Sequence, residues 1–162
     1  MRNSTIIMVE LLAVIVMATT GLRAQEHDMS KMMHLPESQA MVASAYDFTD
    51  TVELLTAAIE EQNLMVIKEI DAQKMLKMVN KKVGGMKQLL FFHPRYMKMI
   101  MEANPMGTIE PPLKIAVMER PDGQVMVKYI KPSALLGKYS GLEEIGKELD
   151  EIVTQITDSV RK

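Results

Sequence analysis

The stretch from Pro111 to Leu135 reads PPLKIAVMERPDGQVMVKYIKPSAL and decides the fold. Two apolar runs, Leu113–Met118 and Val125–Ile130, flank the sequence Pro121-Asp122-Gly123. Proline presets the backbone of a turn and glycine tolerates positive φ, so this spacing predicts a β-hairpin. We expect the two strands of the hairpin to form the centre of a sheet.

Before the hairpin, short apolar runs alternate with stretches of helical periodicity. Asp50 and Glu53 have the spacing of a capping box at a helix start. Pro94 suits the first position of another helix, which places His93 at the N-cap. Glycine can end a helix, and Gly84-Gly85 follow a helical stretch. The predicted strands are Ala40–Tyr46, Leu64–Ile70 and Met86–Phe92, and the predicted helices span 50–62, 72–79 and 95–103.

After the hairpin, apolar residues recur at steps of three and four, which predicts one long amphipathic helix lying across one face of the sheet. Hairpin-linked strands are antiparallel, whereas a doubly wound sheet needs parallel strands joined by crossovers. We therefore predict an α+β domain with a mainly antiparallel sheet and helices packed on one face. The residues that set the period of the last helix are Leu142, Ile145, Leu149, Ile152 and Ile156.

Composition excludes several classes of protein. The chain has 162 residues, a formal net charge of −2 and no cysteine. That length suits one domain with a tail. Because no Lys/Arg stripe stands out, we do not expect nucleic acid as a partner. Disulfides and thiol nucleophiles are impossible.

The N-terminus has the pattern of a secretory signal over residues 1–24. Arg2 supplies the positive start, Ile6–Ala18 is mostly apolar, and Ala24 offers a small residue for cleavage. Glu10 interrupts the apolar run, which is too short for a stable membrane span. We expect export to the periplasm or beyond, with an uncleaved N-terminal anchor as the alternative.

Residues 25–39, QEHDMSKMMHLPESQ, predict a flexible arm ahead of a single domain over 40–162. Imidazole and thioether groups suit Cu(I), and a flexible segment can wrap such an ion. The alternative is a polar leader in a chain that already holds 17 methionines, which also serve as adaptable core residues. The candidate metal ligands of the arm are His27, Met29, Met32, Met33 and His34.

Catalytic chemistry finds little support in the sequence. A nucleophile needs a base and a group that orients it, and His93 is the only histidine after the arm. Tyr129 and Lys131 alternate on the last hairpin strand and share a face. If helices leave that face open, His93, Tyr129 and Lys131 could line a pocket for a small molecule; the alternative is a capping histidine and an ordinary strand face.

Several pieces together resemble the domain-of-unknown-function family 302, over residues 46 to 153. The resemblance implies a compact α+β domain like the TATA-binding-protein arrangement, self-association as a homodimer, and no known activity. Where family members often carry asparagine before the helix proline, this chain has His93. The matching pieces are Tyr46–Glu53, Val66–Asp71, Phe92-His93-Pro94, Pro112–Val117, and Gly123, Val125, Val127, Tyr129 and Pro132.

We therefore expect an exported, non-enzymatic binding module for a small ligand or partner. The alternative is a periplasmic protein that captures Cu(I) or Ag(I) with the Met/His arm.

Titration with Cu(I) against a competing chelator separates these two functions. If the arm handles metal, the protein binds Cu(I) stoichiometrically, and deleting residues 25–39 abolishes that binding because the thioether and imidazole donors are gone. Failure of the intact protein to compete for Cu(I) would end the metal hypothesis.

Overall fold

The hairpin forms as the sequence predicts. In the computed structural model, which describes residues 35–161, β4 (Leu113–Glu119) and β5 (Val125–Ile130) pair antiparallel, with Val117 opposite Val127. The amide of Gly123 donates to the carbonyl of Arg120 at 2.9 Å. Gly123 has a φ of 81°, a conformation that glycine adopts without strain.

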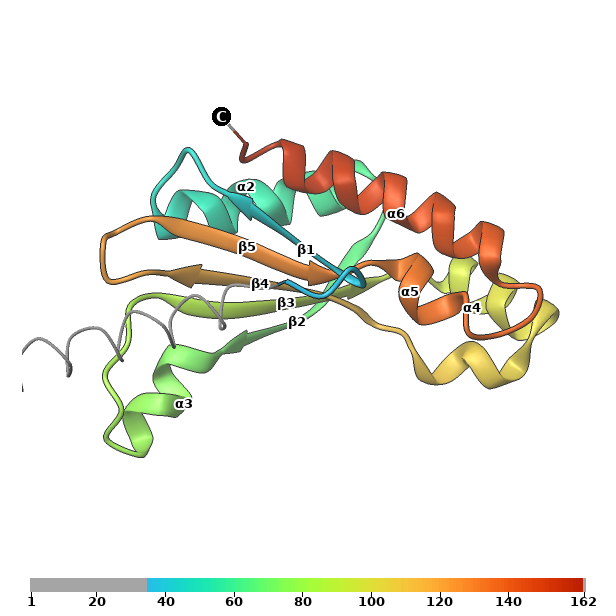
Figure 1. Cartoon of the computed structure of the whole chain (residues 1–162), viewed down its shortest axis with the longest axis horizontal. Helices are drawn as coiled ribbons and strands as arrows, with labels where there is room; N and C mark the ends of the chain where they lie inside the picture. Colours follow the sequence, from blue (N-terminus) through green and yellow to red (C-terminus); the bar gives the residue numbers. More distant parts are fainter. Residues whose placement is uncertain (1–34, 162) are drawn as a thin grey trace, which may run out of the picture. The chain divides into compact units, whose positions relative to one another are not determined.

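Three further strands complete a five-stranded sheet in which every neighbouring pair is antiparallel. Its order is β1-β5-β4-β3-β2, so β4 is central (Figure 1). The flanking strands are β1 (Gln39–Ala43), β2 (Met65–Asp71) and β3 (Met86–Phe92).

Helices α2 (Phe48–Glu61) and α6 (Glu143–Asp158) lie together on one face of the sheet (Figure 1). Within residues 35–161 no helix is both long and apolar enough to cross a bilayer. The short helix α5 and the 3₁₀ turn η1 are absent from our sequence prediction. The remaining elements are α3 (Ala72–Met78), α4 (Pro94–Ala103), η1 (Pro105–Ile109) and α5 (Pro132–Leu136).

The core lies between the sheet and these two long helices. Side chains alternate across a strand, and every second residue of β5, and of β4 as far as Val117, is buried against the helices. The opposite face of β4 and β5 carries half-buried or exposed residues, among them Met118 and Met126. The buried strand residues of the core are Val42, Leu89, Phe91, Phe92, Leu113, Ile115, Val117, Val125, Val127 and Tyr129.

The first strand ends at Ala43, three residues before its predicted end, and two helix caps differ from the prediction. The first helix begins at Phe48, and its N-cap is Asp47, whose carboxylate accepts from the Asp50 amide at 2.9 Å. Asp50 is therefore not the cap but a residue of the first turn, and its backbone amide is the one that the Asp47 carboxylate satisfies. The second helix ends at Met78, well before the glycines, and Asn80, just after its C-cap, lies in the left-handed region with φ of 59°. Asparagine tolerates this conformation better than most residues.

Two contacts fix α5 on α6. The Asp150 carboxylate of α6 accepts from the amide of Ser133 at 2.9 Å and also from its hydroxyl. It thereby caps the first turn of α5 from another element. Gly146 permits the close approach, since a Cβ there would lie 2.8 Å from the Cα of Ser133.

Replacing Asp150 by alanine should lower the free energy of unfolding by about 1–2 kcal/mol, the usual cost of losing a helix cap. Urea denaturation followed by circular dichroism measures this. Glu151→Ala, on the exposed side of the same helix, is the matched control and should have little effect. Equal losses in the two variants would contradict the capping role.

Candidate functional site

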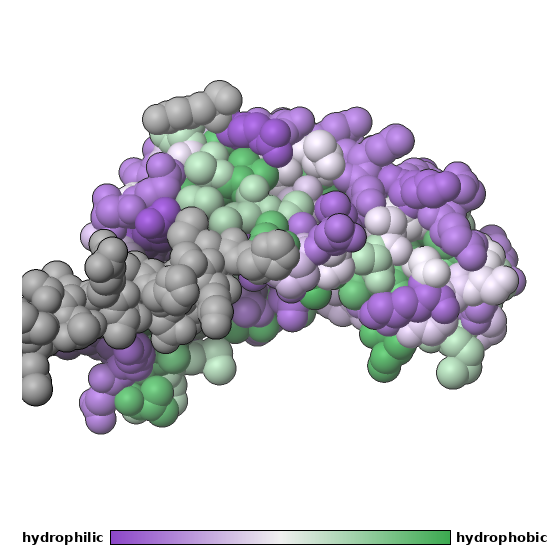
Figure 2. Space-filling model, viewed as in Figure 1, coloured by the Kyte–Doolittle hydropathy of each residue, from purple (hydrophilic) through white to green (hydrophobic). Residues whose placement is uncertain are grey.

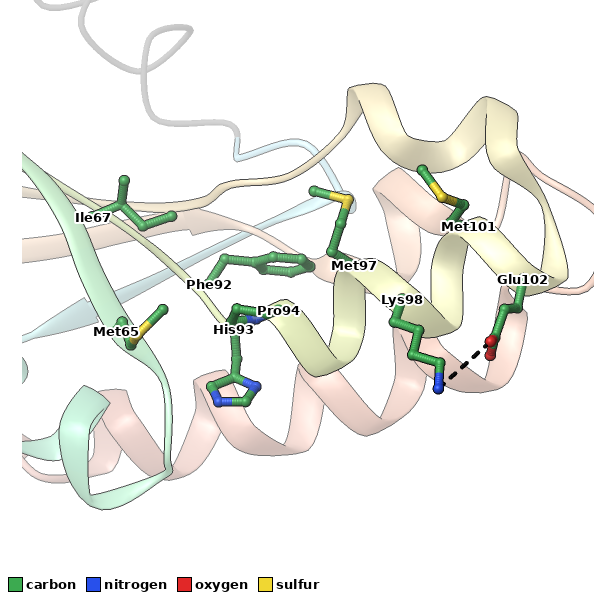
Figure 3. Close-up of a pocket in the computed structure, with 9 residues that line it drawn as sticks. All are labelled: Met65, Ile67, Phe92, His93, Pro94, Met97, Lys98, Met101 and Glu102. Atoms are coloured by element: carbon green, nitrogen blue, oxygen red, sulfur yellow. Dashed lines mark ion pairs between the residues drawn. The ribbon is translucent and has the colours of Figure 1, made fainter.

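A groove of about 550 Å³ opens where β2 and β3 meet the start of α4. Its walls are mainly apolar and carry three methionines (Figure 3). The lining residues are Met65, Ile67, Phe92, His93, Pro94, Met97, Lys98, Met101 and Glu102.

A bulge in β2 forms the strand wall of the groove. The register between β2 and β3 shifts between Val66 and Lys68, so Ile67 has no partner in the ladder. A bulge re-aims side chains and bends its strand. Ile67 is left 57% exposed beside the groove instead of packing in the core.

The sequence His93-Pro94 positions the helical wall. His93 is the N-cap of α4, and its Nδ1 accepts from the Arg95 amide at 3.1 Å, as the sequence predicts for a cap. Met97 and Met101 are four residues apart, so they lie on one side of the helix. Both side chains point to the same side in Figure 3, while the His93 ring points away from them.

Charge in the groove is confined to its rim. Lys98 and Glu102 form an ion pair of 3.7 Å, and both side chains are largely exposed. Such a surface pair contributes little to stability and is easily rearranged. The groove can therefore accept an apolar group, with an exchangeable charge pair beside it.

The opposite side of α4 carries a polar network that serves packing. The Tyr96 hydroxyl donates to Glu148 Oε1 of α6 at 2.7 Å, and Arg95 Nη2 donates to that hydroxyl at 2.8 Å. Burial raises the pKa of Tyr96, and its bond to Glu148 raises that pKa further. Tyr96 therefore stays protonated at neutral pH and is no base; it holds α4 against α6.

The three residues predicted to bind a ligand do not gather at one site. His93 lines the groove, whereas Tyr129 and Lys131 are not among its lining residues. Tyr129 is buried on the sheet face that the helices cover, so the condition for that pocket, an open face, is not met. Lys131 is the N-cap of α5 and is exposed.

The predicted metal ligands of the arm lie outside the described residues. Residues 35–161 hold no group of three His, Asp or Glu side chains that could bind a metal ion.

Sequence reasoning named only His93 among the lining residues and missed the apolar wall, including Met65, Ile67, Met97 and Met101. The spacing of Met97 and Met101 was a usable signal, because two methionines one turn apart share a helix side. Ile67 had no such signal. Its exposure results from the bulge, which one strand's sequence does not reveal.

Replacing His93 by alanine should destabilise the domain by about 1 kcal/mol, because the Arg95 amide loses its acceptor. Replacement by asparagine should cost much less, since asparagine is among the best N-cap residues. Thermal and urea unfolding of both variants measure the difference. Equal stability of the two variants would show that the cap hydrogen bond contributes nothing.

Comparison with known proteins gives a fold and a family. The structure is similar to "Crystal structure of uncharacterized conserved protein DUF302 from Bacillus stearothermophilus", with a TM-score of 0.72 and 18% identity over 78% of this chain and 100% of that chain. At that identity the likeness shows the fold alone. No curated protein matches the chain. Residues 40–160 match the family described as "Domain of unknown function DUF302", and the chain therefore belongs to that family.

Proposed function

We propose that the protein is an exported, non-enzymatic binding module whose groove takes a small apolar or amphipathic molecule. The observation that carries the proposal is the exposed apolar wall of the groove. Ile67 and Met101 are each 57% exposed, and Met65 is 49% exposed. A ligand that covers them gains about 25 cal/mol for each Å² of apolar surface removed from water.

The size and composition of the groove support this ligand class. Binding pockets for small molecules commonly measure about 300–1,000 Å³ and are mostly apolar with few polar groups. The groove has about 550 Å³ and three ionisable side chains, His93, Lys98 and Glu102. Lys98 could pair with an anionic end of the ligand after releasing Glu102, since their ion pair is exposed.

The lining also supports binding over catalysis. A covalent mechanism needs a nucleophile within hydrogen-bond reach of a base. The groove's lining residues include no serine, threonine, tyrosine or cysteine, and its one lysine, Lys98, is exposed and paired with Glu102, not desolvated as a nucleophilic lysine must be. Its histidine uses Nδ1 as an acceptor for the helix cap.

Three parts of the proposal rest on the sequence or the resemblance. Export depends on the signal pattern of residues 1–24. Cu(I) capture by the Met/His arm is a second candidate function, favoured by the thioether and imidazole donors of His27–His34. Assembly as a homodimer follows from the family resemblance.

Displacement of the fluorescent probe anilinonaphthalene sulfonate by decanoate tests the groove. Met101→Gln should weaken decanoate binding about tenfold, because it replaces an apolar contact with a polar amide. Met106→Gln is the matched control: Met106 is 73% exposed on η1 and is not a lining residue. We expect it to bind decanoate as the unaltered protein does.

Two results would contradict this proposal. Failure of both probe and decanoate to bind the native protein would show that the groove does not hold such ligands. Equal affinities for Met101→Gln and the unaltered protein would place any binding elsewhere.

A further inference from the structure

A second surface, at α3, combines exposed apolar residues with a cluster of lysines, whereas the groove has only one lysine. The segment 71–83 projects from the end of β2, apart from the layer formed by α2 and α6 (Figure 1). Its helix has no buried residue. We define the α3 patch as the apolar residues Met75, Met78 and Val79 together with the basic residues Lys74, Lys77, Lys81 and Lys82.

The apolar half of the α3 patch is unusually exposed. Met75, Met78 and Val79 are 59%, 80% and 71% exposed. Figure 2 shows hydrophobic and hydrophilic residues side by side over this helix. A helix of seven residues is marginal in water by itself. Because α3 also buries none of its residues, packing within the described domain does not explain its exposed apolar side chains.

The basic half surrounds a hollow of about 600 Å³. Four lysines and a single carboxylate, Asp71, line it. Asp71 is engaged at the helix start, where it accepts from the Lys74 amide at 2.8 Å. None of the four lysines forms an ion pair within residues 35–161, whereas Lys87, Lys98, Lys138 and Lys147 each do.

The lysine cluster consists of two pairs, Lys74 with Lys77 and Lys81 with Lys82, and a reversal of the chain brings the pairs together. Asn80 turns the chain at the helix end, and the Lys81 amide donates to the carbonyl of Leu76 at 3.0 Å. The Gln73 side chain then reaches the carbonyl of Val83 at 3.2 Å. The turn brings Lys81 and Lys82 to the hollow that Lys74 and Lys77 line. The basic surface is therefore formed by the fold and is not a continuous run of basic residues in the sequence.

We propose that the α3 patch docks the domain on an anionic phospholipid surface. Four lysines near such a surface gain attraction from its negative potential, and adjacent apolar side chains enter the boundary between headgroups and acyl chains. The patch has both components on one projecting segment. The lysines are complementary to the negative charge of the phospholipid headgroups, and the methionine and valine side chains insert below those headgroups.

Two other occupants fit the patch less well. A second copy using the same patch would place lysines against lysines, which repel. Nucleic acid would satisfy the lysines and leave the apolar side chains in water. Segment 71–83 also has no aromatic residue on which a base could stack.

Co-sedimentation of the full chain with vesicles tests the proposal. Vesicles of phosphatidylcholine with phosphatidylglycerol should bind the protein, pure phosphatidylcholine should bind it much less, and added salt should weaken the difference. The double variant Lys77→Gln/Lys81→Gln should reduce binding to the anionic vesicles about twenty-fivefold, at about fivefold for each lysine. Met78→Ser/Val79→Ser should also reduce binding, with far-UV circular dichroism unchanged.

Two matched double variants serve as controls. Lys138→Gln/Lys147→Gln changes the net charge equally at sites away from α3, and Met106→Ser/Ile109→Ser changes apolar residues that are 73% and 78% exposed on η1. Both should bind as the unaltered chain does. All variants keep residues 1–34, so differences between them report the altered side chains alone.

Three results would overturn the proposal. The first is equal binding to anionic and neutral vesicles, which would remove the role of charge. The second is equal loss in the α3 variants and their controls, which would place the contact elsewhere. The third is tight binding of a single-stranded RNA oligonucleotide that depends on Lys77 and Lys81 but not on Met78 and Val79. That pattern would identify the patch as a nucleic-acid surface.

Discussion

Strand alternation is the constraint on which the rest of the structure depends. Each strand of an antiparallel sheet presents two faces, and the two long helices α2 and α6 lie on the same face. That face holds the buried residues of β4 and β5, such as Ile115 and Val127. Large apolar residues at the other face and at the sheet ends have no comparable cover among the described elements, and Met41 and Ile130 are exposed.

The groove and the α3 patch both arise where β2 departs from regular geometry. At one end of β2 the bulge exposes Ile67 beside α4. At the other end Asp71 caps a helix that buries none of its residues. An edge strand tolerates both departures, because only one neighbour, β3, constrains its hydrogen bonds.

Local patterns predicted the elements well. The third strand has the predicted bounds, and His93-Pro94 begins its helix as expected, because cap chemistry is encoded within a few residues. The short helix α5 escaped prediction since its cap, Asp150, comes from seventeen residues away. The ligand site was harder still. Alternation predicts that Tyr129 and Lys131, two residues apart, share a face, but it does not say which face the helices cover.

The two surfaces differ in charge, and this difference separates their roles. The rim charges of the groove, Lys98 and Glu102, are of opposite sign and paired. Because these two charges cancel, the rim produces little net electrostatic attraction, and the groove favours a ligand recognised mainly by apolar contact. The α3 patch concentrates four lysines that form no ion pair with any residue of 35–161, and their attraction extends over about a Debye length, roughly 8–10 Å in physiological salt. A short-range apolar site and a longer-range cationic surface can therefore act together without competing for one partner.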